Sequence, residues 1–163
     1  MTRALIALGS NLGDCRQTLA RAIADIRLLP ETRILSVSRL YSTSPVSEIE
    51  QSDFLNAAAL IETELEPYVL LELLQSIEQT HGRTRTEHWG PRTLDLDIID
   101  IEGFVSTDER LSVPHPLAIE RAFVLHPLND LAPEWVLGEL RVSELVRPTH
   151  AVSVVAEADW CVL

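Results

Sequence analysis

The alternating run from Leu94 to Ile98 constrains the fold more than any other stretch, because it is typical of a half-buried strand. Successive side chains of a strand point to opposite faces. One face, directed to a core, would carry Leu94, Leu96 and Ile98, and the other face would carry Asp95 and Asp97. The two carboxylates would stand ~7 Å apart at their Cα atoms, close enough for the side chains to converge on bound cations. Two metal ions ~3.5–4 Å apart that bridge phosphate oxygens are a recurring arrangement in phosphoryl transfer.

An arginine-rich polar segment comes directly before this run. Arg83, Arg85 and Arg92 lie within ten residues, in a chain that has no lysine and a net charge of −12. Guanidinium groups match the geometry of phosphate oxygens, so the combined segment favours a magnesium–triphosphate site. The alternative is an edge strand whose polar face meets water, preceded by a solvated loop. The Asp-x-Asp pattern alone supports both interpretations; the arginine cluster favours the first.

The bulk composition limits the class of protein. A length of 163 residues favours one domain, residues 1–163, and a hydrophobic content of 46% with 23% charged residues is globular. The net negative charge argues against general binding of nucleic acid or of an anionic membrane surface. Cys15 and Cys161, at opposite ends of the chain, form no disulfide framework, which favours a reduced, cytoplasmic setting. No stretch approaches the length of a membrane span.

Hydrophobic periodicity predicts the order of the elements. A strand at 4–8 precedes a helix capped by Asp14, with Leu19, Ile23 and Ile26 on its apolar stripe. The later elements are a strand at 34–43, a strand at 54–61, a helix that starts at Pro67, and the strand at 94–98. The order β-α-β-β-α-β predicts an α+β fold with a ferredoxin-like core, a mainly antiparallel sheet flanked by helices. Added C-terminal elements include short helices near 120–128 and 142–146.

Three side chains on these elements allow two interpretations each. Phe54 and Asn56 share one face of their strand, which suits a flat, hydrogen-bonding heterocycle; without context, a core Phe54 and a locally paired Asn56 are favoured. Glu78 lies near a helix C-terminus, where a carboxylate is unfavourable to the helix dipole. A solvated Glu78 is favoured over one that binds a ligand.

The long polar connections at 43–53 and 82–93 suit lids that close over a substrate.

Taken in order, these segments resemble the 6-hydroxymethyl-7,8-dihydropterin pyrophosphokinase family. The resemblance rests on the strings A-L-G-S-N-L-G-D, Y-S-T-S-P-V, D-F-L-N-A-A, G-R-T-R-T-E-H-W-G-P-R-T-L-D-L-D-I, R-L-S-V-P-H-P and E-R-A-F-V-L, and it covers nearly all of residues 4–135. The string W-G-P-R-T-L-D-L-D is highly specific. The resemblance implies an ATP-dependent diphosphotransferase of folate biosynthesis. In the reaction that the resemblance implies, the pterin hydroxyl would attack the β-phosphorus of ATP, which would give AMP and the pterin pyrophosphate.

The resemblance also implies roles for particular residues. Asp95 and Asp97 would hold two Mg²⁺ ions, and the catalytic residues would be Arg83, Arg92 and Asp97. The positions that match the nucleotide site are Gln75, Glu78, Arg85, Trp89, Arg92, Ile98, Arg110, Ser112, His115 and Arg121. Those that match the pterin pocket are Thr43, Ser44, Val46, Phe54, Asn56, Trp89 and Phe123, with the two phenylalanines on either side of the ring. The expected partners are ATP and hydroxymethyldihydropterin, without nucleic acid or membrane, and the expected state is a monomer.

The chain departs from the family pattern at three positions. Phe54 replaces a tyrosine of some members, His88 stands where some relatives carry arginine, and Pro116 stands where an aromatic residue can occur.

Two other functions share part of the pattern. A generic Mg-dependent nucleotidyl- or phosphotransferase would need Asp95 and Asp97 but not the aromatic–amide pocket. A non-catalytic ferredoxin-like binding module would bind its ligand without consuming ATP.

Overall fold

The computed structural model describes residues 1–43, 53–82 and 93–162. Its main sheet has the strand order β10-β3-β4-β1-β5, with β2 also paired to β4, and these pairings are antiparallel. The elements of the core are β1 (Thr2–Ser10), α1 (Cys15–Arg27), β2 (Thr32–Val37), β3 (Leu40–Thr43), β4 (Phe54–Thr63), α2 (Pro67–Thr80) and β5 (Asp95–Ile101). This order confirms the predicted ferredoxin-like α+β fold.

The remaining elements follow β5 in the chain and are additions to the βαββαβ arrangement. They are β6 (Ser106–Thr107), β7 (Ser112–Val113), η1 (Ala118–Glu120), α3 (Ala122–Leu131), β8 (Val136–Leu137), β9 (Leu140–Arg141), α4 (Val142–Leu145), β10 (Val152–Ala156) and η2 (Ala158–Cys161). The two predicted C-terminal helices correspond to α3 and α4. The pairing of β10 with β3 was not predicted, because no strong alternation marks residues 148–163.

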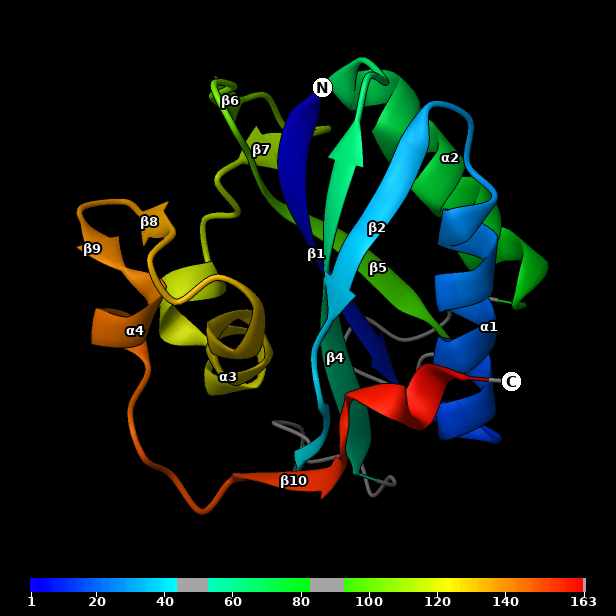
Figure 1. The fold of residues 1–163 in the computed structure, drawn as a ribbon, viewed down its shortest axis with the longest axis vertical. Helices are drawn as coiled ribbons and strands as arrows, with labels where there is room; N and C mark the ends of the chain where they lie inside the picture. Colours follow the sequence, from blue (N-terminus) through cyan, green and yellow to red (C-terminus); the bar gives the residue numbers. More distant parts are fainter. Residues whose placement is uncertain (44–52, 83–92, 163) are drawn as a thin grey trace.

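Helices cover both faces of the sheet (Figure 1). On one face α1, α2 and the C-terminal η2 enclose a first core, and on the other α3 and α4 enclose a second. Strand β4 contributes to both because its side chains alternate: Ala57 and Ala59 lie in the first core, and Ala58 and Leu60 in the second. Among the described residues, no helix has both the length and the apolar content to cross a membrane.

Helix α1 follows its sequence signals closely. The Asp14 side chain accepts a hydrogen bond of 3.2 Å from the backbone N–H of Gln17, which caps the helix as predicted. Leu19, Ile23 and Ile26 are completely buried in the first core. The helix ends at Arg27, three residues before Pro30.

The single strand predicted at 34–43 is wrong, because the chain breaks at Ser38 and Arg39 into β2 and β3. The Ser38 side chain explains the break. Its Oγ accepts a hydrogen bond of 2.8 Å from the backbone N–H of Ala58, in the place of a carbonyl in a regular ladder. The Ser38 carbonyl instead accepts a hydrogen bond of 2.8 Å from the Trp160 indole.

Candidate functional site

Polar side chains from neighbouring strands gather on one face of the sheet. Strand β5 pairs Asp95 with Gly9 and Asp97 with Ala7, and β4 pairs Asn56 with Gly9. Directly paired residues of antiparallel strands lie on the same face, so the two carboxylates and the amide share it. Leu96, between the aspartates, lies on the opposite face and is buried in the first core. The structure therefore places Asp95 and Asp97 on one face, as predicted.

Gly9 separates the amide from the carboxylates on this face. A Cβ atom at position 9 would stand 3.1 Å from Asn56 Nδ2, tighter than ordinary van der Waals contact. A glycine inside a strand often marks a close approach of another group, and this is the signal in the sequence that points to Gly9. Its missing side chain allows the Asn56 amide to approach β1 this closely.

Asn56 is held by a neighbour on β3. Its side chain is buried, and its Oδ1 accepts a hydrogen bond of 2.9 Å from the Thr43 hydroxyl. Local pairing of Asn56, favoured from the residues alone, is therefore confirmed, and it brings together two residues that match the pterin pocket. Phe54 is half-buried and pairs across the strands with Thr43.

Arg121 and Phe123 stand at the start of α3, which packs on the same face of the sheet. Arg121 is the N-cap residue, and its guanidinium carbon lies 5.6 Å from the centroid of the Phe123 ring. Phe123 is partly buried against the second core. The helix thus carries an aromatic ring and a cation on its first turn.

The expectation of a solvated Glu78 is wrong. Glu78 is only 4% exposed, and its Oε2 accepts a hydrogen bond of 2.8 Å from the backbone N–H of Leu96. The end of α2 is thereby joined to β5 at the residue between Asp95 and Asp97. Gln75, one turn earlier on α2, is partly exposed. Ile98 is buried in the first core, so a nucleotide contact there would involve its backbone.

The segment around β7 carries the other nucleotide-site residues that the structure describes. Arg110 forms an ion pair of 2.6 Å with Glu72 and lies 5.4 Å from the centroid of the Tyr68 ring. The Ser112 hydroxyl donates to the Asp108 carbonyl at 3.0 Å. The backbone N–H of His115 donates to the Ile99 carbonyl of β5 at 2.7 Å, which places His115 beside the strand that carries the aspartates.

The surroundings of His115 favour its neutral form. Its Nδ1 accepts a hydrogen bond of 3.2 Å from the backbone N–H of Leu117, so in the neutral ring the proton is on Nε2. Burial, and secondarily the charge of Arg121, lower the pKa of His115 below its ordinary value. At neutral pH the ring can therefore donate from Nε2 without adding a charge.

Six predicted site residues lie outside the described residues. They are Ser44 and Val46 in one segment and Arg83, Arg85, Trp89 and Arg92 in the other, together with the divergent His88. Of the predicted site residues, the structure thus describes the carboxylate pair, the amide with its hydroxyl partner, both phenylalanines and much of the nucleotide side.

The donor set on β5 suits magnesium. Within residues 1–43, 53–82 and 93–162, no cluster of three or more His, Cys, Asp or Glu side chains could enclose a metal ion. Mg²⁺ is usually bound by only one or two carboxylates, with substrate phosphates and waters as its other ligands. Asp95 is partly exposed and Asp97 exposed. The pair therefore fits a magnesium ion that arrives with a phosphorylated substrate.

A separate hollow lies at the other end of the sheet. Its cavity volume is ≈ 500 Å³, and its lining includes Arg3, Glu102 and Trp135. Asp100, near the end of β5, accepts a hydrogen bond of 2.8 Å from the Trp135 indole. Burial raises the pKa of this carboxyl. Asp100 therefore supports the segment after α3, and Arg3 at the start of β1 is far along that strand from Gly9.

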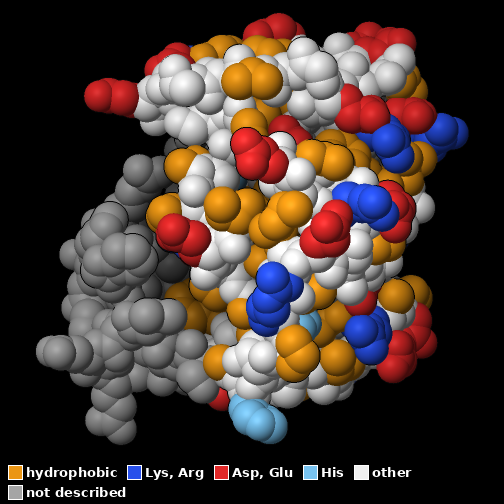
Figure 2. Space-filling view, turned by 90° about the vertical axis from the view of Figure 1, so that its left-hand side faces the viewer, with side chains coloured by type: hydrophobic (Ala, Val, Ile, Leu, Met, Phe, Trp, Pro, Cys, Tyr) orange, Lys and Arg blue, Asp and Glu red, His pale blue; other side chains and the backbone are white. Residues whose placement is uncertain are grey.

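The surface over α3 and α4 carries mixed charges. Figure 2 shows arginines beside acidic side chains and scattered apolar ones on this face. Among its described residues the view shows no broad basic field of the kind that nucleic acid requires.

The fold, together with the polar face of the sheet formed by β1, β4 and β5, defines an α+β protein of the ferredoxin-like class. That face of the sheet carries a carboxylate pair and an aromatic–amide group. Residues 5–133 match the family model of 7,8-dihydro-6-hydroxymethylpterin-pyrophosphokinase (HPPK). The chain belongs to this family, which confirms the resemblance found in the sequence.

Named relatives are similar over most of their length. A 2-amino-4-hydroxy-6-hydroxymethyldihydropteridine pyrophosphokinase of Methylorubrum extorquens is 46% identical over 144 residues, 88% of this chain and 91% of the relative. The protein of the same name from Pseudomonas aeruginosa is 46% identical over 139 residues, 85% of this chain and 86% of the relative.

Solved structures agree on the fold. A crystal structure of HPPK-DHPS in complex with substrates matches 88% of this chain with a TM-score of 0.69 at 15% identity. Wild-type HPPK-DHPS of Plasmodium falciparum matches with the same TM-score and identity. This chain spans only 42% and 43% of those two chains, respectively.

Proposed function

We propose that this chain transfers a pyrophosphoryl group from ATP to the hydroxyl of 6-hydroxymethyl-7,8-dihydropterin, which yields AMP and the pterin pyrophosphate for folate biosynthesis. The observation that carries the proposal is the shared sheet face, on which the Asp95–Asp97 pair lies across Gly9 from Asn56. Membership of the HPPK family and the names of its relatives support the same reaction. ATP is the co-substrate.

In this scheme Asp95 and Asp97 would hold two Mg²⁺ ions. Bound there, the ions would neutralise charge on the phosphates of ATP. Glu78 holds the backbone of Leu96 between the two ligands, so the spacing of the carboxylates is fixed from the core side. Arg83 and Arg92 act on the charge of the transferring unit. The other nucleotide contacts come from Gln75, Arg85, Trp89, Ile98, Arg110, Ser112, His115 and Arg121.

The pterin binds between the two phenylalanines. Phe54 and Phe123 supply flat apolar surfaces for the ring, and the Asn56 amide, oriented by Thr43, supplies hydrogen bonds to its edge. Phe54 lacks the hydroxyl of the tyrosine found in some relatives but keeps the stacking surface. Ser44, Val46 and Trp89 complete this pocket.

One bond forms and one breaks in the transfer. The hydroxyl oxygen of the pterin forms a bond to the β-phosphorus, and the bond from the β-phosphorus to the α,β-bridging oxygen breaks. AMP leaves with that oxygen, and the hydroxyl proton is released to solvent. Transfers of this kind depend mainly on alignment and charge neutralisation, with little covalent work by the protein. Gly9 carries no side chain that would separate the amide from the carboxylates, so the acceptor hydroxyl can bind beside both.

The physiological setting follows from the same proposal. Residues 1–163 act as one pyrophosphokinase domain, a monomer in the cytoplasm, with ATP and the pterin as its partners. The reduced cysteines and the acidic surface are consistent with this setting.

The decisive test measures AMP formed from ATP and Mg²⁺, with and without the pterin, for wild type, Asp97→Ala and Glu139→Ala. Glu139, an exposed carboxylate after β8, is the control for loss of a negative charge. We expect pterin-dependent AMP that falls about 10²–10³-fold in Asp97→Ala, by analogy with loss of one transition-state contact, and remains in Glu139→Ala.

Two outcomes would overturn the proposal. ADP in place of AMP would indicate ordinary phosphoryl transfer by a generic Mg-dependent enzyme. Binding of ATP or pterin without any turnover would indicate a non-catalytic module.

A further inference from the structure

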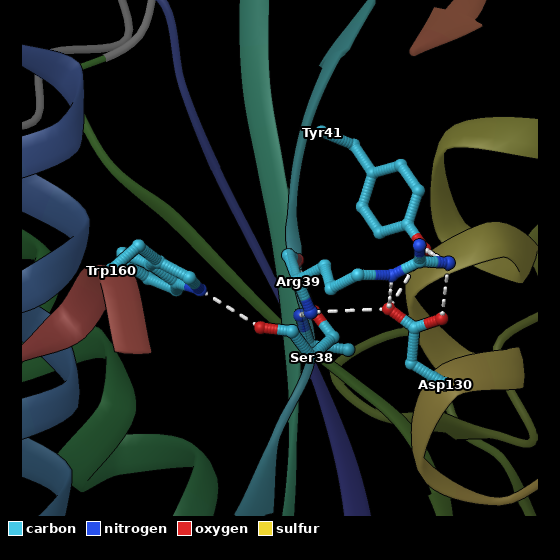
Figure 3. A network of polar contacts seen from close by, with 6 residues as sticks. Ser38, Arg39, Tyr41, Asp130 and Trp160 are labelled. Atoms are coloured by element: carbon cyan, nitrogen blue, oxygen red, sulfur yellow. Dashed lines mark hydrogen bonds and ion pairs between the residues drawn. The ribbon is translucent and has the colours of Figure 1, made fainter. Parts of the chain in front are cut away.

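A cluster of three polar side chains joins β3 to α3 (Figure 3). The Asp130 carboxylate accepts hydrogen bonds from the Arg39 backbone N–H at 3.1 Å and from Arg39 Nε at 3.2 Å and Nη2 at 3.1 Å. It also accepts one of 2.7 Å from the Tyr41 hydroxyl. The Tyr41 hydroxyl in turn accepts from Arg39 Nη2 at 3.1 Å. The last turn of α3 is therefore fixed to the start of β3 by several bonds at once.

The cluster is more than a surface ion pair. Tyr41 is only 3% exposed, and the Asp130 side chain is 16% exposed. Burial and the hydrogen bond to Asp130 raise the pKa of Tyr41 to about 12, so its hydroxyl remains a donor at neutral pH. Hydrogen bonds to a charged, partly buried acceptor are stronger than those of exposed pairs. The cluster can therefore hold two elements in a fixed relation.

Strand β3 leads from the cluster to the amide of the site. Tyr41 pairs directly with Asn56, and two residues later Thr43 donates to the Asn56 side chain. Tyr41 and Thr43 lie on the same face because side chains alternate along a strand. A shift of β3 at Tyr41 would therefore move the hydroxyl that orients the Asn56 amide.

Helix α3 leads from the cluster to the aromatic ring of the site. Phe123 lies seven residues before Asp130 on α3, which is two turns or ~10 Å along the axis and nearly the same side. The helix packs on β3 and β4. Because Asp130 fixes one end of the helix against β3, it also sets the distance from Phe123 to Phe54 and Asn56.

Trp160 holds the same part of the chain from the opposite side of the sheet. Its indole donates to the Ser38 carbonyl, next to Arg39, while Asp130 bonds Arg39 from the α3 side (Figure 3). The break between β2 and β3 is thus bonded from both faces, and β3 has little freedom to slide along β4.

We propose that Asp130, with Arg39 and Tyr41, is a positioning cluster that acts on the geometry of the pterin pocket more than on that of the nucleotide site, to which α3 contributes only its N-cap residue Arg121. The inference rests on the proposed function for its substrate. Neither Asp130 nor its partners needs to touch the pterin; they act through Thr43 with Asn56 and through Phe123.

The test compares Asp130→Asn and Tyr41→Phe with Glu102→Gln in steady-state assays of AMP formation. Glu102 forms a similar cluster with Arg3, through a backbone N–H at 2.8 Å and a guanidinium at 2.8 Å, at the far end of the sheet. We expect Asp130→Asn to raise KM for the pterin about tenfold, the effect of one weakened charge-assisted bond, with KM for ATP within about twofold. Glu102→Gln changes neither KM.

Hydrogen exchange provides a readout that does not depend on turnover. The two variants are compared under conditions of equal thermal stability. Under these conditions the backbone amides of 40–43 and 54–58 should exchange faster in Asp130→Asn than in Glu102→Gln. Tyr41→Phe, which keeps the buried ring, tests the cluster if Asp130→Asn does not fold. Equal changes in both KM values, or none, with unaltered exchange would overturn the positioning role. Wild type that forms no AMP while exchange responds as expected would contradict the proposed function alone.

Discussion

His115 connects the region around β7 to the strand that carries the aspartates, and its ionisation is coupled to this position. Its backbone N–H donates to the Ile99 carbonyl. Burial of its ring, and secondarily the charge of Arg121, lower the pKa of His115 below the ordinary 6.5. A neutral, oriented imidazole offers one donor at Nε2. A nucleotide contact at this site would therefore be a directed hydrogen bond rather than an ion pair.

The depressed pKa predicts a pH dependence of stability. Between the folded pKa of His115 and its ordinary value of 6.5, the unfolded chain binds more protons than the folded one. This contribution to the free energy of unfolding is therefore complete above pH 6.5 and is lost as pH falls through that window. Ring-proton titration by NMR should give a pKa below 6.5, and Arg121→Gln should raise it. An unperturbed or raised pKa in wild type would contradict the burial argument.

At the scale of elements, α2 and β5 are joined through a buried carboxylate. The hydrogen bond from Leu96 N–H to Glu78 fixes the residue between Asp95 and Asp97. In Glu78→Ala this buried donor loses its partner, which costs about 1–3 kcal/mol of unfolding free energy. Glu78→Gln keeps an acceptor oxygen and should recover part of that loss. Urea unfolding measures both variants.

The same pair of variants tests whether Glu78 also organises the metal ligands. The Mg²⁺ concentration for half-maximal AMP formation should rise in Glu78→Ala and stay closer to wild type in Glu78→Gln. If Glu78→Ala is destabilised while its Mg²⁺ dependence does not change, Glu78 supports only the fold.

Local patterns predicted most of these elements, and long-range contacts account for what they did not. Asp14 and the stripe from Leu19 to Ile26 are signals within one helix, so α1 was predictable. The burial of Glu78 depends on a backbone donor 18 residues away in the sequence, a partner that no helical pattern reveals. Alternation likewise placed Asp95 and Asp97 on one face, whereas their relation to Asn56 required the pairing of three strands.

The break at Ser38 is an example at the scale of the whole molecule. Residues 34–43 are rich in strand-forming side chains, and nothing local distinguishes one strand from two. The Ser38 carbonyl bonds an indole 122 residues later in the chain, and Arg39 bonds an aspartate 91 residues later. Such partners come from tertiary packing, which overrides the local preference for a continuous strand.

The C-terminal segment belongs to the core although it lies beyond residue 133, where the family match ends. Trp160, on η2, is 2% exposed and packs in the first core, and η2 contacts α1. Strand β10, just before it, extends the sheet beside β3. The end of the chain thus closes the first core and bonds the break between β2 and β3 from that side.

This arrangement predicts different costs for two replacements of Trp160. Trp160→Phe keeps most of the packing but leaves the buried Ser38 carbonyl without its indole donor, which should cost about 1–3 kcal/mol of unfolding free energy. Trp160→Ala also empties a large volume of the core and should cost about 3–5 kcal/mol. Val162→Ala, at a position 74% exposed in the same segment, is the control and should change little. Urea unfolding of the three variants measures these differences. Equal stability of Trp160→Ala and the control would mean that the C-terminal segment does not stabilise the domain. If Trp160→Phe were destabilised, hydrogen exchange should increase at 36–43, because β3 would lose its bond on this face and keep only the one to Asp130.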